Sequence, residues 1–195
     1  MEYVSWIATA LTASELFLQQ VRAAHAALGI ASDYMQSCAL PLCPEPAQLV
    51  AAELDYYQRP QQLTPAALAA WHGMKQAAAR AGVTLFLISA YRSVQYQSEL
   101  IAKKLQKGQT MQQILSVNAA PGFSEHHTGR ALDMGTTDCP ALVEEFENTK
   151  AFQWLEQNAM AFGFHLSYPR DNAMGIDYEP WHWCFQGQDQ QSTQA

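Results

Sequence analysis

The sequence predicts an α+β fold, in which helices flank a small, mostly antiparallel sheet. Helical patterns come first, one apolar strand pattern and further helical patterns follow, and several short strand patterns lie toward the C-terminus. This order differs from the regular strand and helix alternation that builds a parallel sheet. We expect a helical N-terminal extension packed on the core at residues 1–60, a functional domain at 61–188 and a disordered tail at 189–195.

The expected helices begin at capping residues. Thr12 followed by Glu15 is a capping-box pattern. Thr64 precedes a first-turn proline, and Ser93 can cap the helix after the apolar strand. Apolar residues then recur at helical spacing. The expected helices span residues 12–29, 47–57, 64–82, 93–108, 111–115 and 141–160.

Four segments have the pattern of strands. "VTLFLISA" at residues 83–90 is apolar on both alternating faces, which is typical of a strand buried in the middle of a sheet. "RALDM" at residues 130–134 follows a polar loop, and "FHLSY" and "PWHWCF" read as short aromatic strands. The polar motifs of the chain fall at the ends of these strands.

Composition argues against several partners. The net charge is -7 and only 11 Lys plus Arg are spread along the chain, so the sequence lacks the clustered basic face that nucleic-acid binding requires. No run of about 18 apolar residues exists, so we expect no membrane span. The four cysteines lack C-x2-C spacing, which indicates buried free thiols, although Cys38 and Cys43 could still pair.

The N-terminal stretch "MEYVSWIATALTA" contains an apolar run at residues 4–11, but Glu2 occupies the place where a signal peptide carries Lys or Arg. We interpret the stretch as ordinary structure and expect a cytoplasmic protein. A periplasmic location is the alternative if the chain is a processed mature form. The sequence does not indicate the oligomeric state.

His126, Asp133 and His182 form the most informative set. Imidazole nitrogen and carboxylate oxygen are zinc ligands, and three protein ligands leave one position open for water or substrate, as in catalytic zinc sites. The spacing of His126 and Asp133 fits a loop that turns into a strand. The alternative is that the histidine is a polar loop residue and Asp133 a surface carboxylate.

Two further stretches supply groups for hydrolysis. In "YEPWHW", Glu179 lies three residues before His182, and a glutamate beside a zinc-bound water can take its proton and pass it to a leaving amine. In "SAYRS", directly after the apolar strand, Arg92 offers a planar, permanent charge to a carboxylate or an oxyanion. The alternatives are a solvated arginine at a strand end and tryptophans that only pack in the core.

The stretches "SAYRS", "SEHHTGRALD" and "EPWHW", together with Gln97, resemble the VanY-like zinc D-alanyl-D-alanine carboxypeptidases, a group related to the VanX dipeptidases and the Hedgehog signalling domain. The resemblance covers about residues 65 to 186. It differs at Cys184, where many relatives carry arginine. The 60 N-terminal residues lie outside it and could be a packing extension, a substrate-selecting cap or a dimerisation surface.

The resemblance implies a role for each site residue. The expected zinc ligands are His126, Asp133 and His182, and His127 has no ligand role. Glu179 is expected to act as the catalytic base and acid, and Arg92 to stabilise the transition state. The expected substrate contacts are Ser124, Tyr91, Ser89 and Gln97.

The implied reaction is hydrolysis of the peptide bond before the C-terminal D-alanine of peptidoglycan stem peptides or muropeptides, by D,D- or L,D-carboxypeptidase activity. A chain without a signal peptide would meet recycled muropeptides, which favours the L-centre tetrapeptide. Two alternatives remain. Ser124 lies near His126 and Asp133 as in a serine hydrolase, but "GFSEH" lacks the second glycine of a G-x-S-x-G elbow. The other is a zinc-bearing binding module without catalysis, against which the presence of Glu179 and Arg92 argues.

Overall fold

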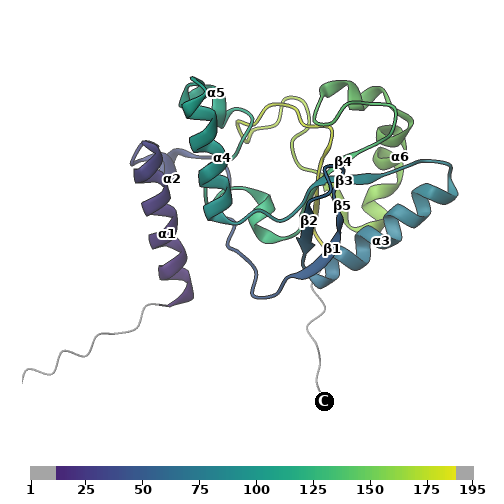
Figure 1. The fold of residues 1–195 in the computed structure, drawn as a ribbon, viewed down its shortest axis with the longest axis horizontal. Helices are drawn as coiled ribbons and strands as arrows, with labels where there is room; N and C mark the ends of the chain where they lie inside the picture. Colours follow the sequence, from purple (N-terminus) through teal and green to yellow (C-terminus); the bar gives the residue numbers. More distant parts are fainter. Residues whose placement is uncertain (1–11, 188–195) are drawn as a thin grey trace, which may run out of the picture.

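The structure is a computed structural model that describes residues 12–187 (Figure 1). The apolar run at residues 4–11 and the expected tail at 189–195 lie outside this range. The α-helices in it are α1 (Ala13–Leu28), α2 (Tyr34–Ser37), α3 (Pro65–Arg80), α4 (Val94–Gln106), α5 (Met111–Leu115) and α6 (Lys150–Asn158). The 3-10 helices are η1 (Glu125–Thr128), η2 (Glu144–Asn148) and η3 (Ala159–Phe162).

The described strands form two antiparallel sheets, which together with the helices confirm the α+β class. The smaller sheet pairs β1 (Val50–Leu54) with β2 (Pro60–Leu63). The larger sheet has the order β3-β4-β6-β5, with β3 (Phe86–Ser89), β4 (Ala131–Gly135), β6 (His182–Phe185) and β5 (Phe164–Leu166). Every pairing in the larger sheet is antiparallel.

The capping residues predicted from the sequence start the helices as expected. Thr12 and Glu15 form a complete capping box at α1. The side chain of Thr64 accepts a hydrogen bond from the backbone of α3, and Ser93 does the same at α4. These caps satisfy N–H groups that a helix cannot pair within its first turn.

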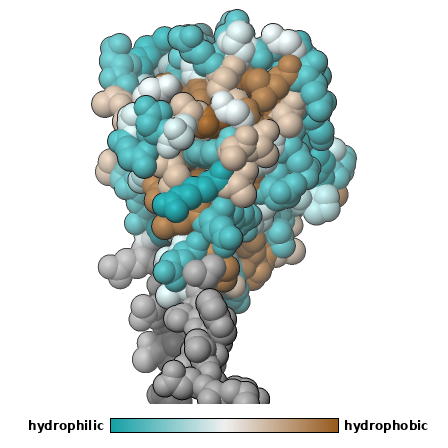
Figure 2. All heavy atoms as spheres, turned by 90° about the vertical axis from the view of Figure 1, so that its left-hand side faces the viewer, coloured by the Kyte–Doolittle hydropathy of each residue, from teal (hydrophilic) through white to brown (hydrophobic). Residues whose placement is uncertain are grey.

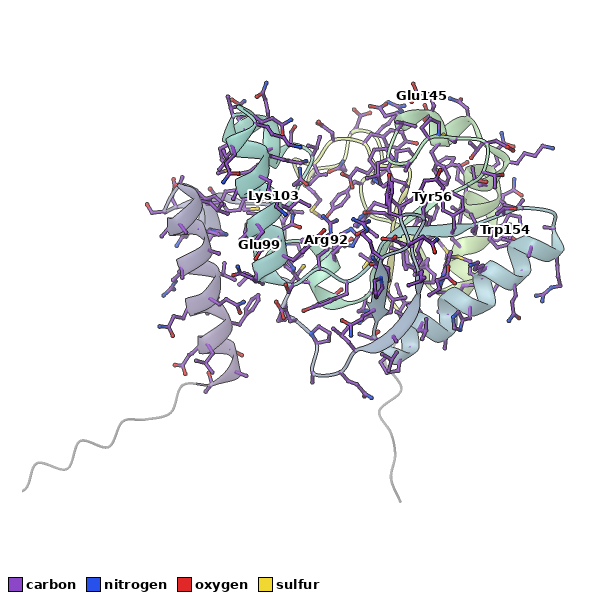
Figure 3. All side chains as sticks on the ribbon, viewed as in Figure 1. Tyr56, Arg92, Glu99, Lys103, Glu145 and Trp154 are labelled. Atoms are coloured by element: carbon purple, nitrogen blue, oxygen red, sulfur yellow. The ribbon has the colours of Figure 1, made fainter. Side chains whose placement is uncertain are left out.

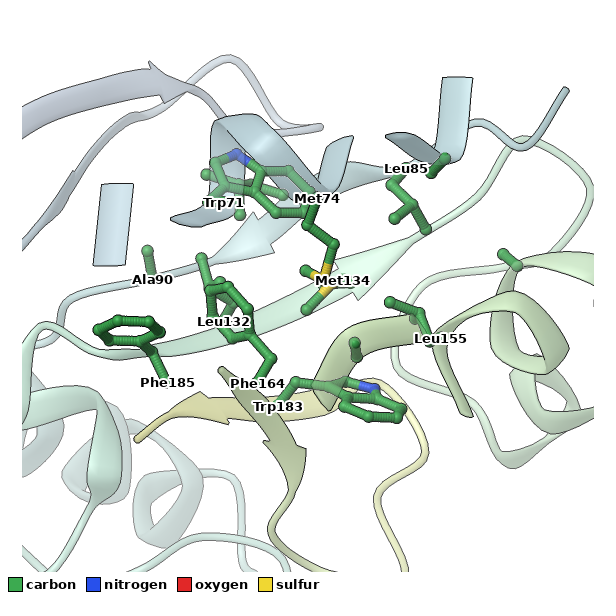
Figure 4. Close-up of a cluster of buried hydrophobic side chains, with 14 of the residues drawn as sticks. Trp71, Met74, Leu85, Ala90, Leu132, Met134, Leu155, Phe164, Trp183 and Phe185 are labelled. Carbon is green, nitrogen blue, oxygen red and sulfur yellow. The ribbon is translucent and has the colours of Figure 1, made fainter. Parts of the chain in front are cut away.

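The main core fills the space between the larger sheet, α3 and α6 (Figure 4). Trp71 and Met74 of α3 are fully buried, as are Leu132 and Met134 of β4. Successive side chains of a strand point to opposite faces. Asp133, between Leu132 and Met134, therefore points away from this core, toward Arg92.

Two sequence predictions about local structure are wrong. Residues 47–57 contain β1 rather than a helix, because β1 pairs with β2 and Asp55 organises the turn between them by accepting hydrogen bonds from Tyr57 and Arg59. The helix expected over residues 141–160 is limited to α6, with η2 and η3 on either side of it.

The position of β3 also differs from the prediction, because β3 is an edge strand of the larger sheet. Leu87 and Ile88 are nevertheless buried. The outer edge of β3 is covered by the chain around the smaller sheet, where the amide of Tyr56 donates to the carbonyl of Leu87 and Arg59 donates to the carbonyl of Ile88. The pattern of apolar residues on both faces therefore indicated correctly that the strand is buried. It did not indicate that the strand lies in the middle of the sheet.

Of the N-terminal extension expected at residues 1–60, the structure describes residues 12–60, which contain α1, α2, a loop and β1, so the region is not helical throughout. α1 lies beside α4 (Figure 1), and its contact with the domain forms a second, smaller apolar cluster that includes Val21, Phe123 and Tyr168. All four cysteines are free thiols, so Cys38 and Cys43 are not paired. Within residues 12–187, each helix is too short or too polar to cross a bilayer.

Candidate active site

The sheet register brings two of the predicted zinc ligands together. Asp133 of β4 pairs with His182 of β6, and Ser89 of β3 pairs with Asp133 on the other side. The side chain of His182 is buried, and its Nδ1 lies 3.0 Å from Oδ1 of Asp133. Two residues that are 49 positions apart in sequence thus become immediate neighbours through strand pairing.

The third predicted ligand comes from the short helix η1, which ends at Gly129 with φ of 64°. This left-handed conformation favours glycine and turns the chain directly into β4. His126 donates a hydrogen bond from Nδ1 to the carbonyl of Ala90 (2.6 Å), and its Nε2 lies 3.3 Å from Oδ2 of Asp133. The loop-to-strand turn predicted from the sequence therefore closes the distance between His126 and Asp133.

These three side chains fit a zinc ion. Their ligand atoms lie within 4.8 Å of one another, and all three residues are buried. Tetrahedral zinc with N and O ligands at about 2.0–2.1 Å requires separations of about 3.3 Å between ligand atoms, and Nε2 of His126 lies 3.3 Å from Oδ2 of Asp133. Nε2 of His126 is buried without a hydrogen-bond partner. An unpaired imidazole nitrogen in such a position is well suited to coordinate a metal.

Glu125 is a site residue that the sequence analysis missed. Its carboxylate lies 2.9 Å from Nε2 of His182, so His182 has one ring nitrogen at Glu125 and the other at Asp133. A carboxylate that holds the second nitrogen of a metal-binding histidine fixes the orientation and tautomer of the ring. The only available signal was its place in "SEHH", directly before His126.

The electrostatics of the site come from charged groups that are buried close to one another. Burial opposes ionisation of Asp133, but His126 and His182 outweigh it and hold the pKa of Asp133 far below its usual range. Burial lowers the pKa of His182, yet the hydrogen bonds to Asp133 and Glu125 outweigh it and raise the pKa to about 10. The carboxylates of Asp133 and Glu125 thus stabilise positive charge at His182, and they would also stabilise the charge of a bound cation.

Glu179 lies beside this set. A backbone hydrogen bond from the amide of His182 to the carbonyl of Glu179 closes the turn that contains Pro180. The carboxylate of Glu179 lies 3.8 Å from Nδ1 of His182. Burial raises the pKa of Glu179 to about 7, with Asp133 adding to the increase and His182 and Arg92 opposing it. A carboxyl group with this pKa can both accept and donate a proton near neutral pH.

Arg92 reaches the same site from the end of β3 (Figure 3). Its Nη2 lies 3.6 Å from Oδ2 of Asp133, and its Nη1 donates to Gln97 of α4 at 3.2 Å. Gln97 is itself fixed by donating to the carbonyl of Ala119 at 2.8 Å. Nε of Arg92 is buried without a partner. The guanidinium group is therefore oriented by Gln97 and retains an unpaired donor.

A narrow cavity, with a volume of about 20 Å³, joins these groups and has room for about one water molecule. Its lining includes Arg92, Gln97, Ser124, His126, Tyr168, Glu179 and His182.

The lining differs in part from the predicted substrate contacts. Tyr168, which no sequence pattern singled out, packs against His182 with 4.8 Å between the ring centroids. Ser89 and Tyr91 are not in this lining, and the hydroxyl of Tyr91 instead donates to Glu45. Ser124 and Gln97 are thus the two predicted substrate contacts that reach the cavity.

The hydrogen bonds of His126 bear on the serine-hydrolase alternative. A serine nucleophile needs a histidine nitrogen to take its proton. Nδ1 of His126 is used by the carbonyl of Ala90, and Nε2 lies against Asp133. Nδ1 is therefore not available to activate Ser124, and Nε2 is directed at Asp133, within the predicted ligand set.

His127 connects the two loops that border the cavity. It is fully buried, donates from Nδ1 to the carbonyl of Arg92 (2.6 Å) and accepts at Nε2 from the amide of Gly122 (3.0 Å). Its ring nitrogens are therefore both used by the backbone. This agrees with the expectation that His127 is not a zinc ligand.

Comparison with known proteins gives the relationships of the chain. Residues 60–188 match the family model of VanY, described as D-alanyl-D-alanine carboxypeptidase. A D-alanyl-D-alanine carboxypeptidase of Enterococcus faecium is 37% identical over 109 residues, which cover 54% of this chain and 31% of that protein. The chain spans 31% to 57% of the length of the curated relatives to which it is similar.

Several solved structures are similar to this one, and two of them show the relationship. The LD-carboxypeptidase LdcB, whose structure concerns peptidoglycan recognition, has a TM-score of 0.65 and 29% identity, over 73% of this chain and 70% of that chain. A variant of a vancomycin-resistance D,D-pentapeptidase VanY in complex with Zn(II) has a TM-score of 0.57 and 28% identity, over 74% of this chain and 83% of that chain. The chain belongs to the VanY family of D-alanyl-D-alanine carboxypeptidases.

Proposed function

We propose that this protein is a zinc-dependent carboxypeptidase that hydrolyses the peptide bond before the C-terminal D-alanine of peptidoglycan stem peptides. The observation that carries the proposal is the close grouping of His126, Asp133 and His182, with Glu179 and Arg92 at the same cavity. Membership of the VanY family and the Zn(II) bound by a related VanY support it.

Three side chains would hold the metal: His126 through Nε2, Asp133 through its carboxylate and His182 through Nδ1. The hydrogen bonds to Ala90 and Glu125 leave these two imidazole nitrogens for coordination. When bound, zinc supplies Lewis acidity, which polarises a peptide carbonyl and makes water a stronger nucleophile near neutral pH. The buried setting strengthens these electrostatic effects.

Glu179 carries the proton in this mechanism. Its carboxylate accepts a proton from the attacking water, and the resulting carboxylic acid donates that proton to the leaving amine of D-alanine. A pKa of about 7 suits both halves of this cycle, because the group can be ionised for the first step and releases its proton readily in the second. Burial, the main cause of the raised pKa, also keeps bulk water away from the transfer.

Arg92 and Ser124 bind the substrate. An exopeptidase must recognise the free C-terminal carboxylate, and this acidic protein needs local donors for that purpose. Arg92 offers a guanidinium group held by Gln97 with one unpaired donor, and Ser124 lines the same cavity. The guanidinium group also stabilises the oxyanion that develops during hydrolysis.

For the scissile bond we favour the L-centre tetrapeptide, which ends in an L-centre residue followed by D-alanine. The likeness to the LD-carboxypeptidase LdcB supports this choice. The proposal includes a cytoplasmic location, where recycled muropeptides would be the substrates. Fractionation of the native host, followed by detection of the protein in each compartment, tests the location.

Incubation of the zinc-loaded protein with a free-acid tetrapeptide, its C-terminal amide and a pentapeptide, followed by mass analysis, tests the activity. We expect loss of one D-alanine from the tetrapeptide, no cleavage of the amide, and inhibition by a chelator that added zinc reverses. Cleavage of the pentapeptide alone would overturn the choice of bond. Full zinc occupancy with no cleavage of either free acid would overturn the activity and favour a binding module.

A further inference from the structure

The N-terminal segment at residues 13–49 lies outside the residues that match the VanY family model, yet it contacts both loops that border the cavity. One loop, residues 90–93, follows β3 and contains Arg92. The other, residues 121–124, precedes η1 and contains Ser124. Seen from the side of α1, the surface is mostly hydrophilic with smaller apolar areas (Figure 2). The contacts of this segment that can affect the cavity lie on its inner side, against the two loops.

His25 of α1 holds the loop at residues 121–124. Its Nε2 donates to the carbonyl of Pro121 at 2.8 Å, and its ring stacks on Phe123 with 5.9 Å between the ring centroids. The side chain of His25 is buried. A buried donor that pairs with a loop carbonyl is costly to lose, because the carbonyl is then left unsatisfied.

Gly122 gives the same loop two further contacts with the N-terminal segment. Its carbonyl accepts a hydrogen bond of 2.8 Å from the amide of Cys43. Val21 of α1 is fully buried against it, and a Cβ atom on Gly122 would lie 2.4 Å from a Val21 methyl group. The backbone of Gly122 also has φ of 88°, which favours glycine. The loop is thus held closely between α1 and the rest of the site.

Glu45 holds the loop at residues 90–93 in a similar way. One carboxylate oxygen accepts from the hydroxyl of Tyr91 at 2.8 Å, and the other accepts from the amide of Val94 at 2.7 Å. Val94 is the first residue of α4, where an acidic group also interacts favourably with the helix dipole. The carboxylate of Glu45 therefore contacts the chain on both sides of Arg92 in sequence, at Tyr91 and at Val94.

We propose that residues 13–49 form a brace for the active-site cavity, in which His25 and Glu45 are positioning residues that act through Ser124 and Arg92. The inference rests on the proposed carboxypeptidase function. Misplacement of a substrate-binding group by about 1 Å can reduce turnover about 100-fold. Loss of one brace contact should shift its loop by less than this and produce an effect of about 10-fold.

Activity measurements on the full chain test the brace. Glu45→Leu removes both acceptors, whereas Glu45→Gln keeps an acceptor for Val94 and a polar group for Tyr91. We expect kcat/KM to fall about 10-fold in Glu45→Leu and to recover in Glu45→Gln, with about one zinc per chain in both. His25→Phe keeps the ring stacking but lacks the donor, and should also lose about 10-fold. His72→Phe, at an exposed histidine of α3, is the matched control and should keep full activity.

A double-mutant cycle tests whether each residue acts through its partner. In an Arg92→Ala background, Glu45→Leu should lower kcat/KM little further. In a Ser124→Ala background, His25→Phe should likewise lower kcat/KM little further. Additive losses in both cycles, or a Glu45→Gln variant as poor as Glu45→Leu, would overturn the proposal and leave only a general packing role.

Amide hydrogen exchange of the zinc-loaded protein tests, without an activity measurement, whether the brace holds the two loops. Glu45→Leu should speed exchange in residues 91–94 but not in 121–124, and His25→Phe should do the reverse. Unchanged exchange in both loops, or a uniform increase along the chain, would refute the brace. Failure of the wild-type protein to hydrolyse any stem peptide would instead refute the proposed function, and the exchange result would still decide on the brace.

Discussion

Nε2 of His182 lies 2.9 Å from the carboxylate of Glu125, on the opposite side of the ring from Asp133. The two carboxylates divide the two nitrogens of one imidazole between them. Glu125 takes the nitrogen that points away from the candidate metal site, so Nδ1 remains for the metal. His182 is thereby restricted to one orientation by a residue directly next to another ligand in the sequence, His126.

Replacement of Glu125 by Ala should therefore lower zinc affinity about 10- to 100-fold, because the ring of His182 loses the partner that orients it. Competition with a chromophoric zinc chelator measures this affinity. Glu144→Ala, which removes a carboxylate that pairs with Arg170 at the surface, is the control and should leave zinc binding unchanged. Equal affinity in both variants would show that Glu125 does not orient the ligand.

Glu179 and Asp133 should respond differently to substitution, because only Asp133 is assigned as a ligand. Glu179→Gln should retain about one zinc per chain but lose turnover about 100-fold or more, the size expected for a general acid and base. Asp133→Ala should lose both zinc and activity. Elemental analysis beside rate measurements separates the two effects, and loss of zinc in Glu179→Gln would contradict the assigned role.

Arg92→Lys should lower kcat/KM by at least about 10-fold while zinc remains bound. Lysine places a point charge where the planar guanidinium group now contacts Gln97 and Asp133 together, so it cannot keep both contacts and still present a donor to the substrate. Arg80→Lys, at an exposed position of α3, controls for the general effect of the exchange. Rates for Arg92→Lys that match the control would remove Arg92 from the mechanism.

Short sequence patterns predicted the parts of this fold that depend on interactions between residues close together in the sequence. Thr12, Thr64 and Ser93 cap helices because their own side chains pair with amides three residues later, so the pattern is complete within one turn. Residue type indicated His126, Asp133 and His182 as candidate ligands, and the family resemblance implied the zinc-binding role of all three.

Contacts between residues that are far apart in the sequence could not be predicted from such local patterns. The segment at residues 47–57 contains good helix formers, but pairing with β2 determines its structure, which is a tertiary effect that overrides intrinsic propensity. His25 shows no catalytic pattern in sequence, because its partner Pro121 lies 96 residues away. Tyr168 is similar, since its contact with His182 depends on how the loop before β6 folds back.

His127 makes the stability of the protein depend on pH. Burial lowers its pKa to about 4, whereas the unfolded chain has a histidine pKa of about 6.5. Below pH 6.5 the unfolded state therefore binds a proton that the folded state does not. The stabilising effect of a neutral His127 is complete above pH 6.5 and is lost as the pH falls toward 4.

His127→Gln should reduce this dependence, because glutamine does not titrate but can donate to the carbonyl of Arg92 and accept from the amide of Gly122, the two partners of His127. Between pH 7 and pH 4, the wild-type protein should lose about 3 kcal/mol more unfolding free energy than the variant. Urea unfolding at several pH values, with a chelator present so that zinc release does not contribute, measures the difference. His25 and His126 remain in both proteins, so their titration cancels in the comparison. Parallel stability curves for the two proteins would mean that His127 takes up its proton equally well in the folded and unfolded states.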